Sequence, residues 1–302
     1  MIAVIFGILS AISLGVADFL ANRNAVRLGA DRTLCGMLAV GTVGLTLVGL
    51  GLGVAPPHDV IAVSLIVLHG IGLALALLLF FAALARGPIT VVAPIVGAHP
   101  VLVVAFAAAV GRVPDRLETA AMAAIVVGVI LVGTALEPSG SSATDAGRQP
   151  ATDPIRQPPV TLSILALAGS ASVIYAIAVI AGQEGATRSD GFAALWFGRA
   201  IGFLLILALL ALQRRDLRFW QLSWRRQGLI AAHGTLDTLG FFLLLAGGMT
   251  ANPEFTAVVS STFSVVTVVL ACILLGERMN RLQVLGLALI VGGVAALGYS
   301  NP

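Results

Sequence analysis

Lysine is absent from this chain of 302 residues, and charged residues of any kind make up only 10% of it. A soluble domain carries about 25% charged residues. Hydrophobic residues instead reach 59%, and the mean hydropathy is +1.05. So few charges exclude an ordinary water-soluble domain and predict a chain whose surface lies largely in lipid, with the bilayer as its partner.

Cysteine is nearly absent too, and several familiar motifs are missing. Cys35 and Cys272 both fall in apolar stretches, where we expect buried small side chains rather than a disulfide or a metal site. There is no Walker A loop, no HExxH and no GxSxG, so we expect no ATP hydrolysis, no cofactor and no metal. The arginines are spread over loops, so no nucleic-acid partner is predicted.

Ten apolar stretches account for most of the chain. Each is long enough for the hydrocarbon core, which is about 30 Å thick and needs about 20 helical residues. They cover residues 2–21, 33–54, 60–84, 89–110, 116–136, 161–182, 191–212, 227–248, 254–275 and 282–299. Because only short polar joints separate them, we predict an all-α integral membrane protein with ten transmembrane helices.

One long polar segment, residues 137–160, divides the chain near its middle. It is rich in Ser, Asp, Pro and Gln, a composition typical of a disordered linker. We interpret residues 1–136 as a first five-helix repeat and residues 161–302 as a second.

The two halves match at an offset of about 165 residues. Residues 110–118 face 275–283, Gly128 faces Gly293, and the pair His69-Gly70 faces His233-Gly234. Five helices cross the membrane an odd number of times, so the second half starts on the opposite side. The sequence therefore predicts two inverted repeats, an arrangement that places a substrate site between the halves near the midplane.

Two charges lie near the middles of predicted spans. A charge at the centre of a membrane helix costs about 2.5–3.5 kcal/mol on insertion scales. Arg199 and Asp237 lie near the middles of consecutive antiparallel spans. We expect them at similar depth, where they pair and line a cavity between the halves. A purely structural ion pair is the alternative.

Three further polar residues are candidates for substrate binding. Asp18 lies toward the end of the first span, where it lines a cavity mouth or reaches out to water, and it is a candidate proton carrier. His99 precedes Pro100 in mid-span, where proline frees a backbone carbonyl and kinks the helix. Tyr175 offers an aromatic wall with a hydroxyl, or fills the core.

Other polar residues have structural interpretations. His69 and His233 occupy matching repeat positions near helix starts, which favours hydrogen bonding at the interface. Glu277 follows the ninth span and suggests an interfacial salt bridge. An intramembrane enzyme stays open as an alternative, because Ser260, Ser261 and Ser264 could meet His233.

Several segments resemble the drug/metabolite transporter superfamily, in its EamA-like ten-helix branch. They are Gly15-Val16-Ala17-Asp18-Phe19-Leu20, Arg199 in the seventh span, Gly234-Thr235-Leu236-Asp237-Thr238-Leu239-Gly240, and Leu275-Gly276-Glu277-Arg278 followed by Leu282-Gln283-Val284-Leu285-Gly286. The likeness covers nearly the whole chain outside the linker. Arg112 stands where the family usually has Glu, and Phe263-Ser264 lacks the usual proline, so no proline kink is predicted there.

The resemblance implies a secondary transporter of small metabolites or drugs that works by alternating access without ATP, often as an exporter. Asp18, His99, Tyr175, Arg199 and Asp237 are the predicted substrate-binding residues, and protons are the candidate coupling ion. We expect a multi-pass protein of the plasma or inner membrane, as a monomer or, alternatively, a dimer. A non-transporting receptor or assembly partner is the second function considered.

Orientation is left open by the sequence. Most arginines lie in odd-numbered loops, so the positive-inside rule places both termini outside. The family resemblance implies the reverse.

Overall fold

A computed structural model describes residues 2–109, 116–133, 160–214, 222–248, 260 and 262–300. Every regular element in these ranges is helical. The elements are α1 (Ile2–Leu28), α2 (Ala30–Leu52), α3 (Val60–Leu84), α4 (Ile89–Gly97), α5 (Pro100–Ala109), α6 (Arg116–Gly133), α7 (Leu162–Thr187), α8 (Gly191–Leu212), α9 (Trp224–Gly248), α11 (Phe263–Leu270), the π-helical turn η2 (Ala271–Leu275) and α12 (Arg281–Ser300). The predicted all-α class is confirmed.

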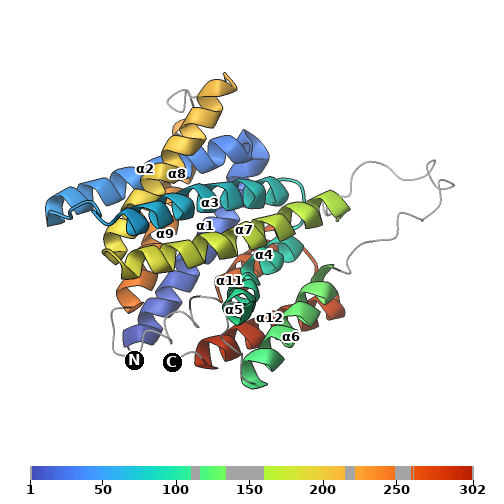
Figure 1. The fold of residues 1–302 in the computed structure, drawn as a ribbon. Coiled ribbons are helices and arrows are strands. Elements are labelled where there is room, and N and C mark those ends of the chain that lie inside the picture. The colour runs from blue at the N-terminus through green and yellow to red at the C-terminus, as the bar shows by residue number, and fades with distance from the viewer. Residues whose placement is uncertain are drawn as a thin grey trace.

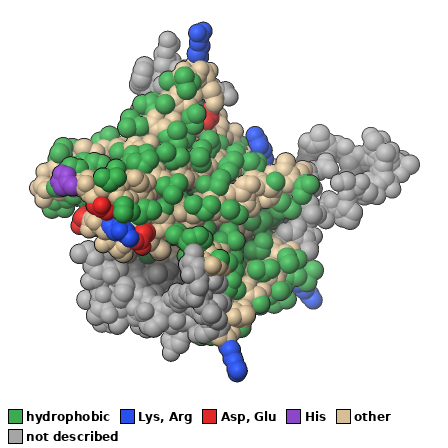
Figure 2. All heavy atoms as spheres, viewed as in Figure 1, with side chains coloured by type: hydrophobic (Ala, Val, Ile, Leu, Met, Phe, Trp, Pro, Cys, Tyr) green, Lys and Arg blue, Asp and Glu red, His purple; other side chains and the backbone are tan. Residues whose placement is uncertain are grey.

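Five of these helices are long and apolar enough to span a membrane, by length and composition. They are Ile5–Leu28, Ala30–Leu52, Val60–Leu84, Leu162–Thr187 and Gly191–Leu212. The other expected spans correspond to shorter apolar helices or to α9, which is as long but carries two arginines, His233 and Asp237. Hydrophobic side chains cover most of the described surface in Figure 2, as expected for a surface that faces lipid.

The helix pairs of the two halves mirror each other. α3 packs on α7 and α8, and in the same way α9 packs on α1 and α2. α1 contacts α11, while α7 contacts α4 and α5. Two pairs join matching helices, α2 with α8 and α6 with α12, the last lying side by side at the lower right of Figure 1. Each of these contacts therefore recurs with the halves exchanged.

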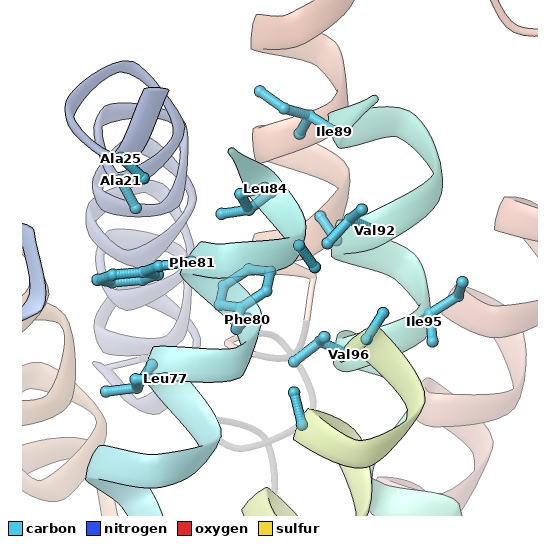
Figure 3. Close-up of a cluster of buried hydrophobic side chains, with 14 of the residues drawn as sticks. Ala21, Ala25, Leu77, Phe80, Phe81, Leu84, Ile89, Val92, Ile95 and Val96 are labelled. Atoms are coloured by element: carbon cyan, nitrogen blue, oxygen red, sulfur yellow. The ribbon is translucent and has the colours of Figure 1, made fainter. Parts of the chain in front are cut away.

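Aromatic side chains of α3 fill the space beside α1 and α4. Phe81 points toward Ala21 and Ala25 of α1, whereas Phe80 points toward α4 (Figure 3). The two rings lie 5.9 Å apart, centroid to centroid. Because the α1 residues opposite Phe81 are alanines, the ring is buried to 1% exposure without a gap. This core fixes α1 and α3 around the candidate site described below.

The first helix is longer than the sequence suggested. We predicted an end near residue 21, but α1 continues to Leu28. Its last turns tolerate polar residues because backbone carbonyls of neighbouring helices accept hydrogen bonds from their side chains. Asn22 Nδ2 donates to Leu84 O at 2.6 Å, and Asn24 Nδ2 donates to Leu229 O at 3.5 Å. Asp18 consequently lies inside the helix rather than near its end, while its place at a cavity mouth or reaching out to water stays a prediction.

The fourth span is interrupted where His99-Pro100 predicted a kink. α4 ends at Gly97, Ala98 has φ −83° and ψ 3°, and α5 begins at Pro100. In the second half, α11 begins after Thr262, which has φ −75° and ψ 2°. No proline stands beside Thr262, so a helix start at this residue was not predicted.

Glu277 caps a helix that belongs to the other half. Its Oε1 and Oε2 accept the backbone N–H groups of Ile89 (3.0 Å) and Thr90 (2.9 Å), at the start of α4. Pro88 at the N-cap offers no side-chain hydrogen bond, so a carboxylate from elsewhere satisfies the free amides and the helix dipole. The salt-bridge interpretation of Glu277 did not include this role.

We expect Glu277→Ala to lower the free energy of unfolding by about 2 kcal/mol, because two charge-assisted hydrogen bonds are lost at a helix start. Glu277→Gln keeps one acceptor and should lose about half as much. Thermal unfolding in detergent measures both, with the exposed Glu184→Ala as control. Equal unfolding temperatures for all variants would contradict the capping role.

Close backbone approach joins α6 to α12. A Cβ added at Gly293 would lie 2.7 Å from Ala121 O and 2.6 Å from Ile125 Cγ1, whereas the adjacent Gly292 has nothing within 4 Å. Small residues at such crossings let membrane helices approach. The α6–α12 contact therefore depends on Gly293 and not on Gly292.

Gly293→Leu is expected to force α12 away from α6 and to destabilise the fold by more than about 1–3 kcal/mol, the usual cost of overpacking. Gly292→Leu is the matched control, since it changes helix propensity in the same way and meets open space. Size-exclusion profiles and unfolding temperatures in detergent separate the two. A Gly293→Leu protein as stable as its control would refute this packing.

Some predictions fall outside the described residues. The predicted linker lies there except for Val160, as do Arg112 and Ser261.

Candidate functional site

Arg199 and Asp237 form the expected ion pair. Arg199 comes from the middle of α8 and Asp237 from the middle of α9, and Arg199 Nη1 contacts Asp237 Oδ2. Exposure is 1% for Arg199 and 6% for Asp237. Burying two charges costs desolvation energy. The protein tolerates this pair at such depth because each charge neutralises the other.

The pair lies where the second half meets the first. A Cβ added at Gly41 of α2 would clash with Thr238 Oγ1 and lie 3.4 Å from Arg199 Nη1. Glycine at this position therefore lets α2 approach the ion pair closely. Gly41 did not stand out in the sequence, because glycine is frequent throughout this chain.

The guanidinium of Arg199 stacks on an aromatic ring but lacks hydrogen-bond partners. Its Cζ lies 5.0 Å from the ring centroid of Phe241 on α9, a cation–π contact. Among the residues that the structure describes, Nε, Nη1 and Nη2 have no hydrogen-bond partner. Other buried polar atoms without a hydrogen-bond partner in the described ranges are Thr33 Oγ1, Thr42 Oγ1, His233 Nδ1 and Thr238 Oγ1, while Asp237 Oδ2 has only its ion-pair contact with Arg199.

Asp18 and Tyr175 join this cluster from the two helices that flank it. Asp18 of α1 is half-buried and interacts electrostatically with Asp237. Tyr175 of α7 interacts electrostatically with Asp18, Arg199 and Asp237. Four of the five predicted residues therefore share one electrostatic environment.

His99 belongs to the site through Tyr175. The two rings lie 4.5 Å apart, centroid to centroid, at an angle of 51°. His99 Nδ1–H donates to Val96 O at 3.2 Å, in the break between α4 and α5. The interrupted helix thus turns the imidazole toward Tyr175, and all five predicted residues are brought together.

The matching histidines differ in their partners. His69 Nδ1–H donates to Ala178 O at 2.7 Å and so ties α3 to α7. His233 on α9 is 1% exposed and packs on Phe81, with the rings 5.4 Å apart. It interacts electrostatically with Asp237 and Arg199, so His233 lies beside the candidate site, whereas the sequence predicted hydrogen bonding at the interface for it.

The first half has no charges at the corresponding positions. At the offset that matches His69 with His233, Cys35 corresponds to Arg199 and Leu73 to Asp237. Both residues are buried in the apolar core, at 1% and 4% exposure. A five-helix half therefore packs without this ion pair, which indicates that the charges serve more than packing.

Of the serines considered for an enzyme, Ser260 contacts another hydroxyl, and Ser261 lies outside the described residues. Ser10 Oγ donates to Gly240 O and lies 2.8 Å from Ser260 Oγ. His233 Nδ1 accepts from neither Ser260 nor Ser264 in the described part of the chain. Within the same ranges, no three or more His, Cys, Asp or Glu are grouped to hold a metal ion.

Fold and site together define a multi-pass membrane protein with a buried polar cluster between its halves. The family model described as "EamA-like transporter family" matches residues 1–134 and 162–299. The chain belongs to this family of the drug/metabolite transporter superfamily, whose members are transporters and not enzymes.

The remaining comparisons concern the fold. No curated protein matches the chain. A solved structure titled only "Crystal structure of protein" is similar over 97% of this chain and 95% of its own length, with 20% sequence identity and a TM-score of 0.60. This likeness extends to the whole described fold.

Proposed function

We propose that this protein is a secondary transporter that carries a small metabolite or drug across the membrane by alternating access. One observation carries the proposal: a buried ion pair, Arg199 with Asp237, lies against α2 of the first half, and the Arg199 guanidinium and the nearby Thr238 hydroxyl have no hydrogen-bond partner in the described residues. Ionisable residues inside a membrane protein face the bundle interior and mark substrate or ion pathways.

We propose ten spans, arranged as two inverted five-helix repeats of residues 1–136 and 161–302. The mirrored helix contacts support this arrangement, as do the two separate stretches that match the family model. With five spans per half, the repeats are related by an axis in the membrane plane, and rocking of one half against the other exposes the site alternately to each side.

The proposed substrate site consists of Asp18, His99, Tyr175, Arg199 and Asp237. Asp18 and Asp237 are the proposed proton carriers, because they are coupled carboxylates that a proton can neutralise. We further propose export across the plasma or inner membrane by a monomer, without a cofactor.

Reconstitution tests the transport proposal. Purified protein in liposomes is given a panel of labelled metabolites and drugs, and exchange across the bilayer is measured against protein-free liposomes. Inverted membrane vesicles and intact cells then give the direction. The Glu184→Gln/Arg188→Gln protein is the control, because it removes an exposed arginine–carboxylate ion pair (2.7 Å) on α7.

We expect protein-dependent exchange of at least one panel member in the wild type and in this control, and its loss in Asp237→Ala. Exchange that persists in Asp237→Ala would reject the site. An absence of exchange for the entire panel would favour a receptor or assembly partner.

A further inference from the structure

One edge of the Arg199 guanidinium has no hydrogen-bond partner in the described part of the chain. Nη1 is held against Asp237 Oδ2, while Nε and Nη2 have no hydrogen-bond partner in the part of the chain that is described. In a planar guanidinium, Nε–H and one Nη2–H point the same way. This edge matches two oxygens of a carboxylate or phosphate group.

Burial makes the free edge informative. Arg199 is 1% exposed, and an unpaired buried donor costs the full desolvation penalty, which is larger for charged groups. Native structures leave few such groups unpaired. The hydroxyls of Thr42 and Thr238 are unpartnered as well. Thr238 lies beside Arg199 at Gly41, so α8 and α9 both contribute polar atoms without hydrogen-bond partners to this region.

The internal repeat provides a control for a merely structural role. Cys35 and Leu73 occupy the positions of Arg199 and Asp237 in the first half and are buried. The same helix packing is thus compatible with an apolar pair. Retaining two charges in the second half costs desolvation energy that packing does not require.

We propose that the Nε/Nη2 edge of Arg199 binds an oxyanion, either a carboxylate or a phosphate group, of the transported molecule. Asp237 holds Nη1, and Phe241 supports the plane of the guanidinium, so the donor fork is positioned before the ligand arrives. The proton proposed for Asp18 offsets the added negative charge. This inference names the substrate class of the proposed transporter. It rests on the proposed function, because it takes the bound ligand to be the transported molecule.

Thermal unfolding in detergent tests the site without requiring transport. Sodium acetate and sodium phosphate are compared with sodium chloride at equal ionic strength. A ligand that binds only the folded state raises the unfolding temperature. We expect acetate, phosphate or both to raise it by several degrees in the wild type and in Glu184→Gln/Arg188→Gln. A shift with acetate indicates that the substrate binds through a carboxylate group, and a shift with phosphate indicates that it binds through a phosphate group.

Two variants remove the edge in different ways. Arg199→Lys keeps the charge beside Asp237 but has no fork, and should lose at least about tenfold in anion affinity, since a bidentate charged pair is replaced by a point charge. Arg199→Cys/Asp237→Leu reproduces the apolar pair of the first half, and it keeps the test valid if Arg199→Lys does not fold. General salt effects on stability appear equally in all variants.

The outcomes are distinct. No shift in the wild type, or equal shifts in the wild type and both variants, would overturn the oxyanion site. If reconstituted protein exchanges panel compounds but shows no anion-dependent shift, transport stands and the oxyanion site falls. If the shift depends on Arg199 but nothing is exchanged, the site stands and the proposed transport falls.

Discussion

Asp237→Ala is expected to abolish exchange in liposomes and to lower stability by about 3–5 kcal/mol, the cost of leaving one member of a buried ion pair without its partner. Arg199 would keep its charge at 1% exposure with no carboxylate on Nη1. Asp237→Asn should behave similarly, because an amide removes the neutralising charge while preserving the volume.

The double variant separates stability from transport. Arg199→Cys/Asp237→Leu should recover most of the unfolding temperature, because the first half packs with these residues, yet it should exchange nothing. Circular dichroism melting and tracer exchange measure the two effects. If the double variant exchanges substrate at the wild-type rate, the ion pair has only a structural role.

Asp18→Asn should uncouple transport from the proton gradient. Asp18 is half-buried in α1 and interacts electrostatically with Asp237, so its proton and the state of the ion pair are linked. An asparagine imitates the protonated carboxyl group permanently. Accumulation driven by a pH difference should fall at least about tenfold, the effect of about 1.4 kcal/mol, while exchange at equal pH on both sides persists.

Paired assays in the same liposomes measure this difference: accumulation with an imposed pH gradient, and counterflow without one. Glu184→Gln removes an exposed carboxylate and is the control. Gradient-driven accumulation that is unchanged in Asp18→Asn would exclude this carboxyl group as the proton carrier.

The ion pair was predictable because charges are costly in apolar helices. Arg199 and Asp237 lie in consecutive antiparallel spans, so sequence distance alone indicated similar depth. His99-Pro100 likewise predicted the break between α4 and α5 through the chemistry of proline. In both cases a local rule was sufficient.

Long-range contacts explain what the sequence did not reveal. The end of α1 was placed too early because Asn22 is satisfied by Leu84 O, a contact between residues far apart in the chain. The role of Glu277 depends on the start of α4 in the other half. Gly41 matters only because Thr238 and Arg199 lie against it. α11 begins after Thr262, where no proline in the sequence predicts a helix boundary.

The opposite orientation of the two halves is the central claim, and cysteine accessibility tests it most directly. Single cysteines replace His58, between α2 and α3, and Gln213, after α8, in a protein carrying Cys35→Ala and Cys272→Ala. A membrane-impermeant maleimide is applied to intact cells and to inverted vesicles. Inverted repeats predict that the two positions are labelled from opposite sides. Labelling of both from the same side would contradict the account.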